Sequence, residues 1–220
     1  MLANLDPPVP ILVPGEVGVP FSAVALFGCA CPLEVEIGVG KGRFLQDWAL
    51  VHPEIGVIGV ERARVYVTLA ATRVARAGLV NVRVLHTTAE DLLHRCLALA
   101  SVRCVHIYFP DPWPKKRHHK RRFFRPDNVA RLAAVLAPGG LLRVKTDHPG
   151  YAEVIAEVLA AEPGLRATAV DEAFAEVPPT NFEIKYAVEE RPVFRFAFLR
   201  PPGAGSSRAS VDAGGNLGQR

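Results

Sequence analysis

The sequence predicts an α/β fold whose mostly parallel sheet is covered by helices on both faces, and three observations support this prediction. From residue 33 to residue 161, short β-rich runs alternate with longer helical stretches, which is typical of doubly wound parallel sheets. After residue 163 this alternation stops, which indicates a different arrangement at one edge of the sheet. The chain has 220 residues and is 50% apolar, which is enough for one α/β domain with a sizeable core.

The expected elements are assigned in chain order. Strands are expected at residues 33–37, 55–60, 82–86, 102–109 and 141–146, and helices at residues 43–51, 63–77, 89–99, 127–136 and 151–161. Gly139 and Gly140, after Pro138, end a helix and turn the chain into the next strand. Two further strands, at 165–170 and 193–199, flank a polar loop, and we expect an antiparallel pair that closes the sheet at seven strands.

The two ends of the chain differ in composition from its middle. Residues 1–31 are punctuated by proline and glycine and are poor in charge, so we expect an irregular arm. Residues 201–220 are rich in glycine, serine and alanine, and they predict a disordered tail. Residues 32–200 are therefore expected to form a single domain.

Composition also bears on the compartment. No apolar run reaches the ~18 residues that a membrane span needs. Lys41 is the first basic residue, so the positive segment of a secretory signal is missing. Four cysteines form no CxxC pair and no zinc-ligand spacing, so we expect reduced thiols, a cytoplasmic protein and no metal site. They are Cys29, Cys31, Cys96 and Cys104.

A glycine-rich segment follows the first expected strand and opens the first expected helix. A dinucleotide-binding fingerprint would need glycine at position 43, which is Arg43. An acidic residue, Glu61, ends the second expected strand, where carboxylates accept ribose hydroxyls. A tight turn is the alternative interpretation of the glycines alone, but the glycines with Glu61 favour a nucleotide-type cofactor. The residues of this segment are Glu36, Gly38, Gly40 and Gly42.

The segment Pro110–Arg122, PDPWPKKRHHKRR, follows the fourth expected strand and so begins at the same edge of the sheet. Residues 112–126 carry seven Lys or Arg and no acid, whereas the rest of the chain carries a net charge of −3. A solvated charged face is the alternative, but the position at the crevice favours contact with a phosphate backbone. His118 and His119 are expected on this surface rather than on a metal. Three aromatics either stack on bases or pack in the core: Trp113, Phe123 and Phe124.

These segments, together with Thr146-Asp147 and Thr180–Glu183, resemble the bacterial tRNA (guanine-N7-)-methyltransferase family, which modifies guanine 46 in the variable loop of tRNA. The resemblance covers about residues 33–199, and the PDPWPKKRHHKRR segment is its most specific part. It implies a Rossmann-like class I methyltransferase fold, S-adenosylmethionine as cofactor and tRNA as partner. An obligatory protein partner is not indicated, and the choice between monomer and homodimer stays open.

The resemblance also implies a role for individual residues. Glu36 and the glycines belong to the cofactor loop, Glu61 holds the ribose, and Asp111 lies between cofactor and target guanine. The family usually has Asp or Asn at the adenine, where this chain has Thr88, and Glu90 is the alternative. The implied substrate contacts are Lys115, Asp147, Thr180, Asn181, Phe182 and Glu183. The implied contacts with the tRNA backbone are Lys116, Arg117, Lys120, Arg121 and Arg122.

Chemistry limits what such a site must supply. Guanine N7 carries a lone pair without deprotonation, so placement against the methyl donor matters more than a general base. A carboxylate, Asp111 or Asp147, would stabilise the positive charge that forms on the purine. The alternatives are a turn residue for Asp111, a helix N-cap for Asp147 and a capping box for Thr180 and Glu183. For the function of the whole chain, the alternatives are another kind of methyltransferase and a non-catalytic RNA-binding protein with this fold.

Overall fold

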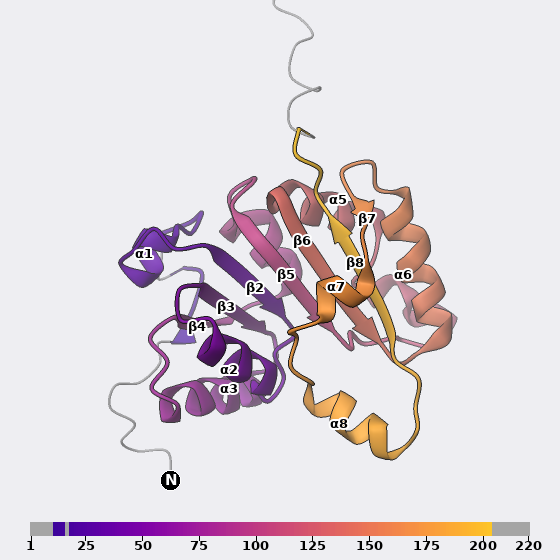
Figure 1. Cartoon of the computed structure of the whole chain (residues 1–220), viewed down its shortest axis with the longest axis horizontal. Coiled ribbons are helices and arrows are strands. Elements are labelled where there is room, and N and C mark those ends of the chain that lie inside the picture. Colours follow the sequence, from indigo (N-terminus) through magenta and orange to yellow (C-terminus); the bar gives the residue numbers. More distant parts are fainter. Residues whose placement is uncertain (1–10, 16–17, 204–220) are drawn as a thin grey trace, which may run out of the picture.

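An eight-stranded sheet organises the computed structural model, which describes residues 11–15 and 18–203 (Figure 1). The strand order is β1-β4-β3-β2-β5-β6-β8-β7. Strands β1 to β6 pair in parallel, and β8 runs antiparallel to both β6 and β7. The strands are β1 Ile11–Leu12, β2 Leu33–Ile37, β3 Gly56–Glu61, β4 Val82–His86, β5 Val102–Tyr108, β6 Leu136–Thr146, β7 Arg166–Ala167 and β8 Phe194–Leu199.

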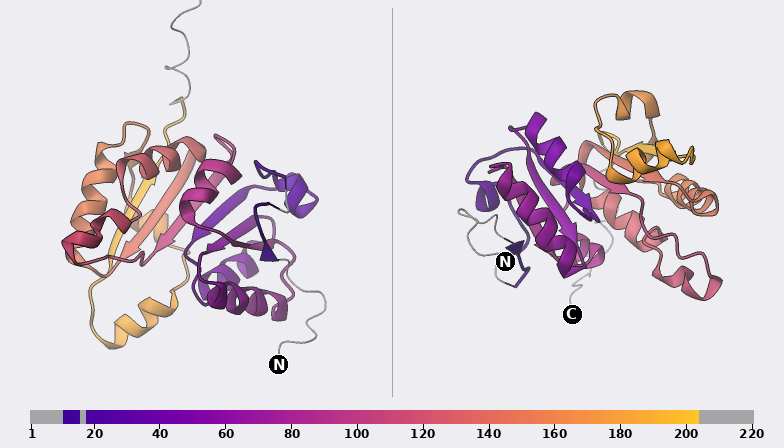
Figure 2. Two further views of the ribbon diagram at one scale, coloured as in Figure 1. Left: turned by 180° about the vertical axis from the view of Figure 1, so that it is seen from behind. Right: turned by 90° about the horizontal axis from the view of Figure 1, so that it is seen from below.

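The helices cover both faces of the sheet, as Figures 1 and 2 show, with α2 and α3 on one face and α5 and α6 on the other. Among the described residues, no helix combines the length and hydrophobicity that a membrane span requires. The helices are α1 Ala23–Phe27, α2 Arg43–Val51, α3 Arg64–Arg76, α4 Ala89–Asp91, the π-helix η1 Leu92–Cys96, the 3₁₀ helix η2 Lys116–Arg121, α5 Pro126–Val135, α6 Pro149–Ala161, α7 Val170–Phe174 and α8 Asn181–Val188.

Two apolar clusters, one on each side of the sheet, hold these layers together. One includes Phe44, Leu45 and Trp48 of α2 packed with α3. The other includes Leu132 of α5 and Ile155 of α6. This arrangement confirms the predicted α/β fold with a mostly parallel sheet and an antiparallel C-terminal strand.

The number of strands differs from the prediction because the sheet has an eighth strand, β1, from the N-terminal segment. Ile11 and Leu12 pair in parallel with Val84 and Leu85 of β4. Two residues among prolines carry no alternating pattern, so this strand depends on the partner edge that tertiary folding supplies. Residues 1–10 and 204–220, including most of the expected tail, lie outside the described part of the chain.

The rest of the N-terminal segment also packs against the domain. Ser22 caps α1, and Gly28 ends it in a left-handed conformation. Phe21 is buried and its amide donates to the Cys96 carbonyl at 2.7 Å. The described part of the expected irregular arm therefore contains a strand, a helix and a core residue.

Candidate functional site

The site is built where the carboxyl ends of β2, β3, β5 and β6 meet, which is the usual ligand edge of a doubly wound sheet. The loop after β2 carries the predicted glycines, and Glu61 ends β3. Asp111 follows β5, and Asp147 follows β6. Four segments that are distant in sequence thus converge on one edge, as the pattern predicted.

The three glycines have left-handed backbones but serve two purposes. Gly38 and Gly40 have φ of 81° and 51°, and a Cβ on either would meet no atom within 4 Å. They therefore leave open space at the strand end, where a ligand can approach the backbone. Gly42 has φ of 71°, and a Cβ there would lie 2.8 Å from Ala70. This glycine lets α2 pack closely on α3.

Backbone amides hold the Glu61 carboxylate in place. Its Oε1 accepts hydrogen bonds from the amides of Arg62 and Ala63, each at 2.9 Å. Its Oε2 accepts from the Gly40 amide at 3.1 Å. The carboxylate therefore links the glycine loop to the start of α3 and stands at the position predicted for the ribose contact.

Glu36 is the most unusual group at this edge. Its side chain is buried, and its Oε2 has no hydrogen-bond partner. Burial, followed by the negative charge of Glu61, raises the pKa of Glu36 to about 8. A buried carboxyl oxygen without a partner, next to an open glycine loop, fits a ligand that brings a donor or a positive charge.

The predicted adenine contact has a structural role in the folded chain. Thr88 is the N-cap of α4, and its Oγ1 accepts from the Asp91 amide at 3.1 Å. Glu90 lies 3.9 Å from Arg125 at the surface. Both residues follow β4 near the cofactor edge, and the adenine contact of either stays a prediction.

Asp111 is exposed and lies between two residues with left-handed backbones. Phe109 has φ of 55° and Trp113 has φ of 42°, a conformation that costs energy for large side chains. The Phe109 amide is held by the Lys145 carbonyl at 2.8 Å. Strain of this kind is concentrated at functional sites, and here it aims the segment around Asp111 outward from the end of β5.

Within the basic segment Pro110–Arg122, residues Lys116–Arg121 form the short 3₁₀ helix η2. Arg121 stacks over Trp113 at 4.9 Å, and Trp113 also contacts His118. Within residues 18–203, no carboxylate forms an ion pair with the five exposed cations of the segment. These are Lys115, Lys116, Arg117, Lys120 and Arg121.

Arg122 departs from its predicted role in contacting the tRNA backbone. Its side chain is buried, its Nε donates to the Pro112 carbonyl at 2.8 Å, and its guanidinium lies over Tyr151. It therefore ties the segment to α6 instead of presenting charge to solvent. Phe124 is also buried, so of the two alternatives for this ring the structure shows core packing.

The predicted polar loop around Thr180 is wrong, because the segment begins helix α8. Thr180 Oγ1 accepts from the Glu183 amide at 3.1 Å, and Glu183 Oε2 accepts from the Thr180 amide at 2.9 Å. These reciprocal bonds are the capping box that was the alternative interpretation. Asn181 and Phe182 are exposed in the first turn, and the Phe182 ring lies 5.3 Å from that of Phe109.

Asp147 is not the N-cap of α6, which is His148. The Asp147 carboxylate instead accepts from Arg191 at 2.9 Å, beyond the end of α8. The Arg191 guanidinium in turn lies over the ring of Tyr186, which α8 contributes. Sequence reasoning missed Phe109, Tyr186 and Arg191. Only the fold of α8 against the sheet edge brings Tyr186 to Phe109 and Arg191 to Asp147.

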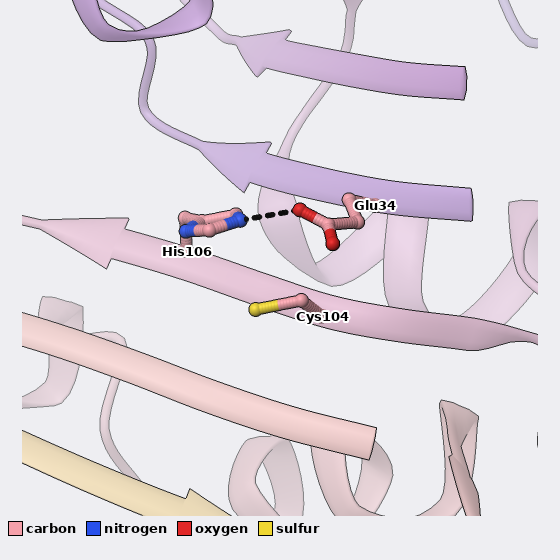
Figure 3. Close-up of side chains that lie close together, drawn as sticks. All are labelled: Glu34, Cys104 and His106. Carbon is pink, nitrogen blue, oxygen red and sulfur yellow. Dashed lines mark hydrogen bonds and ion pairs between the residues drawn. The ribbon is translucent and has the colours of Figure 1, made fainter. Parts of the chain in front are cut away.

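A second polar cluster lies in the core, away from this edge. Figure 3 shows Glu34, Cys104 and His106 close together, all buried. Glu34 Oε2 accepts from His106 at 2.9 Å and from Trp48 at 2.8 Å. The Arg143 guanidinium lies 3.8 Å from Cys104 Sγ, and a positive charge there disfavours a metal cation. The cluster is a hydrogen-bonded network that needs no ion to satisfy Glu34.

Comparison with known proteins agrees with this site. A family model described as "Putative methyltransferase" matches residues 30–196. A tRNA (guanine-N(7)-)-methyltransferase of Mycobacterium avium is 40% identical over 190 residues, which are 85% of this chain and 73% of that protein. Another, of Alkalilimnicola ehrlichii, is 42% identical over 76% of this chain and 71% of its own length.

Solved structures with low sequence identity to this chain share its fold. The crystal structure of the 16S rRNA methyltransferase KamB has a TM-score of 0.57 and covers 80% of this chain and 91% of its own, at 18% identity. At that identity the likeness shows the methyltransferase fold and nothing narrower. The family model and the relatives match most of the sequence and are more specific. They show that the chain belongs to the tRNA (guanine-N7)-methyltransferase family.

Proposed function

We propose that the protein transfers the methyl group of S-adenosylmethionine to N7 of guanine 46 in the variable loop of tRNA, giving 7-methylguanosine. The observation that carries the proposal is the convergence of an open glycine loop, the unpartnered Glu36 and an unpaired basic segment on one sheet edge. The relatives named for guanine-N7 methylation of tRNA support the reaction. Because tRNA is the substrate, we place the protein in the cytoplasm.

The residues around the glycine loop fit this cofactor. S-adenosylmethionine supplies an activated methyl group on a positively charged sulfonium. In the proposal Gly38 and Gly40 leave room for the ligand, Glu36 meets a polar or cationic group, and Glu61 accepts the ribose hydroxyls. Thr88 or Glu90 contacts the adenine.

The remaining residues bind and orient the base. Transfer forms a bond between the methyl carbon and guanine N7 as the bond from carbon to sulfur breaks, and the purine becomes positively charged. We propose that Asp111 stabilises that charge, and that Asp147 and Glu183 accept from the guanine N1–H and its exocyclic amine. To accept from the base, the Asp147 carboxylate must first give up its ion pair with Arg191. Lys115 belongs to these substrate contacts, and the other exposed cations of the basic segment contact the tRNA backbone.

The test uses unmodified tRNA and a labelled methyl donor. We expect label in the tRNA, and after reduction and aniline treatment the chain should break at guanine 46. A tRNA with adenine at position 46 is the control and should remain unlabelled. Methylation at another atom or position would refute the reaction, whereas binding of tRNA without methyl transfer would favour a non-catalytic RNA-binding protein.

A further inference from the structure

Helix α8 carries Thr180–Glu183, yet it stands apart from the sheet (Figure 1). Two of its contacts with the sheet edge are aromatic packing and an ion pair at the surface. Phe182 and Tyr186 pack against Phe109, and Arg191, just beyond the helix, pairs with Asp147. Because Arg191 is 44% exposed on its side chain, water competes with that pair. A third contact, an ion pair at the first turn of α8, is buried.

Lys145 supplies that contact from within the sheet. Its side chain is 2% exposed, and its Nζ lies 2.9 Å from Glu183 Oε1 and 2.9 Å from Oε2. The ammonium also lies 4.7 Å from the centre of the Tyr108 ring and 5.3 Å from that of Phe174. A cation held over two aromatic rings and against both oxygens of a carboxylate has little freedom to move.

The partner of this ammonium is the residue that caps α8. Glu183 Oε2 accepts the Thr180 amide as well as the Lys145 ammonium, so one carboxylate joins the start of the helix to strand β6. Within the described residues, the other charges near the pair are Arg195 of β8, which is 3.6 Å from Glu183 Oε1, and Arg143 of β6. Arg195 is about half-exposed, so in the described part of the chain Lys145 is the only buried cation that pairs with this carboxylate.

We infer that Lys145 is a positioning residue of the methyl-transfer site, which holds the Glu183 carboxylate and the first turn of α8 in the geometry that receives the target guanine. Lys145 acts on the substrate only through Glu183, because its side chain is buried against that carboxylate. Burial lowers the pKa of Lys145, and the Glu183 carboxylate opposes part of that shift. The effect on guanine rests on the proposed function, whereas the attachment of α8 does not.

The test compares Lys145→Met with Arg195→Met as a matched control. Both side chains pair with Glu183 and lie near Phe174, but only Lys145 is buried. We expect Lys145→Met to raise the KM for tRNA at least about tenfold, because the Glu183 carboxylate loses its buried partner and is left with the half-exposed Arg195. The Kd for S-adenosylmethionine should change less than about twofold, and Arg195→Met should leave both values near wild type.

Hydrogen exchange tests the attachment without relying on activity. Amides of α8 should exchange at least about tenfold faster in Lys145→Met, while those of β5 and β6 keep wild-type rates. A wild type that methylates no tRNA would refute the proposed function and leave this measurement decisive for α8. Wild-type KM and wild-type α8 exchange in Lys145→Met would overturn the inference.

A double variant separates positioning of the carboxylate from support of the fold. The double variant Lys145→Met with Glu183→Gln removes both charges, but the glutamine can still close the capping box with Thr180. We expect α8 exchange to return toward wild type while the KM for tRNA stays high. Recovery of both would show a structural role only and contradict the inference. If Lys145→Met does not fold, Glu183→Gln alone must raise the KM for the inference to stand.

Discussion

At the scale of single residues, the candidate site depends on carboxylates that the fold holds in different states. Glu61 is held in place by three backbone amides. Glu36, close by, is buried with one oxygen unpartnered. Asp111 is exposed between two strained residues. The same functional group thus serves as a fixed acceptor, a group that awaits a partner and an exposed charge.

Glu36 should make stability fall as the pH rises. Its pKa is about 8 in the folded protein, against 4.5 ordinarily, so between these values the folded chain holds a proton that the unfolded chain has lost. This group should therefore cost up to about 1.4 kcal/mol of stability per pH unit from about pH 5 to about pH 8. Urea unfolding at several pH values should show that Glu36→Gln lacks this part of the decline. An identical decline in both proteins would contradict the prediction.

Asp111→Ala should lose activity while the fold survives. The carboxylate is exposed and supports no described hydrogen bond, so unfolding by urea should match wild type. Loss of the charge that stabilises the cationic purine should lower kcat by about 100-fold or more. Turnover close to wild type would end the assignment. Asp127, an exposed acid at the start of α5 that has no role in the proposal, provides a control as Asp127→Ala.

At the scale of elements, close packing decides where helices can lie. Helix α2 starts at Gly42, whose missing side chain allows Ala70 of α3 to come near. The segment around Thr180 becomes a helix through a capping box and its contacts with the sheet edge, although it carries no clear helical stripe. In this protein, individual contacts determine where helices lie as much as the periodicity of apolar residues does.

Gly42→Ala should destabilise the fold more than Gly78→Ala. Both glycines have left-handed backbones, with φ of 71° and 66°, but only at Gly42 would a Cβ clash, at 2.8 Å from Ala70. Backbone strain alone should cost about 1 kcal/mol at Gly78, and overpacking should bring the cost at Gly42 to about 2–4 kcal/mol. Urea unfolding of the two variants gives the difference, and equal losses would mean that α2 and α3 shift apart freely.

At the scale of the whole molecule, charge is unevenly distributed. The chain carries a net charge of +4, yet everything outside residues 112–126 sums to −3. The structure places five cations of this segment at the surface, beside the sheet edge that holds the other site residues. A polyanion approaching this edge meets positive charge, and other faces offer less attraction.

Binding of tRNA should therefore depend on salt through this segment. Replacing Lys116 or Lys120 with Gln should lower the slope of log K against log salt by about 0.7–0.9 for each phosphate that the variant no longer neutralises. Arg166 is an exposed cation on the edge strand β7, and Arg166→Gln should leave the slope unchanged. Binding measured over a range of salt tests this, and equal slopes in all variants would exclude the segment as the surface that binds tRNA.

The sequence by itself determined the alternation of strands and helices, the glycine loop with Glu61, and the basic segment after β5. These features are local, because periodicity, turn glycines and a run of like charge are all read within a few residues. For the same reason β2, α2 and β4 have the boundaries that the sequence predicted.

Only the tertiary structure decided which distant side chains meet. Strand β1 needs an edge to pair with, and Arg122 is buried because Tyr151 and Pro112 lie beside it. Lys145 and Glu183 are 38 positions apart and carry no shared pattern. Long-range packing fixes such pairs. In this protein a local capping box starts α8 where a polar loop was expected, and long-range contacts, among them one buried charge, attach that helix to the candidate site.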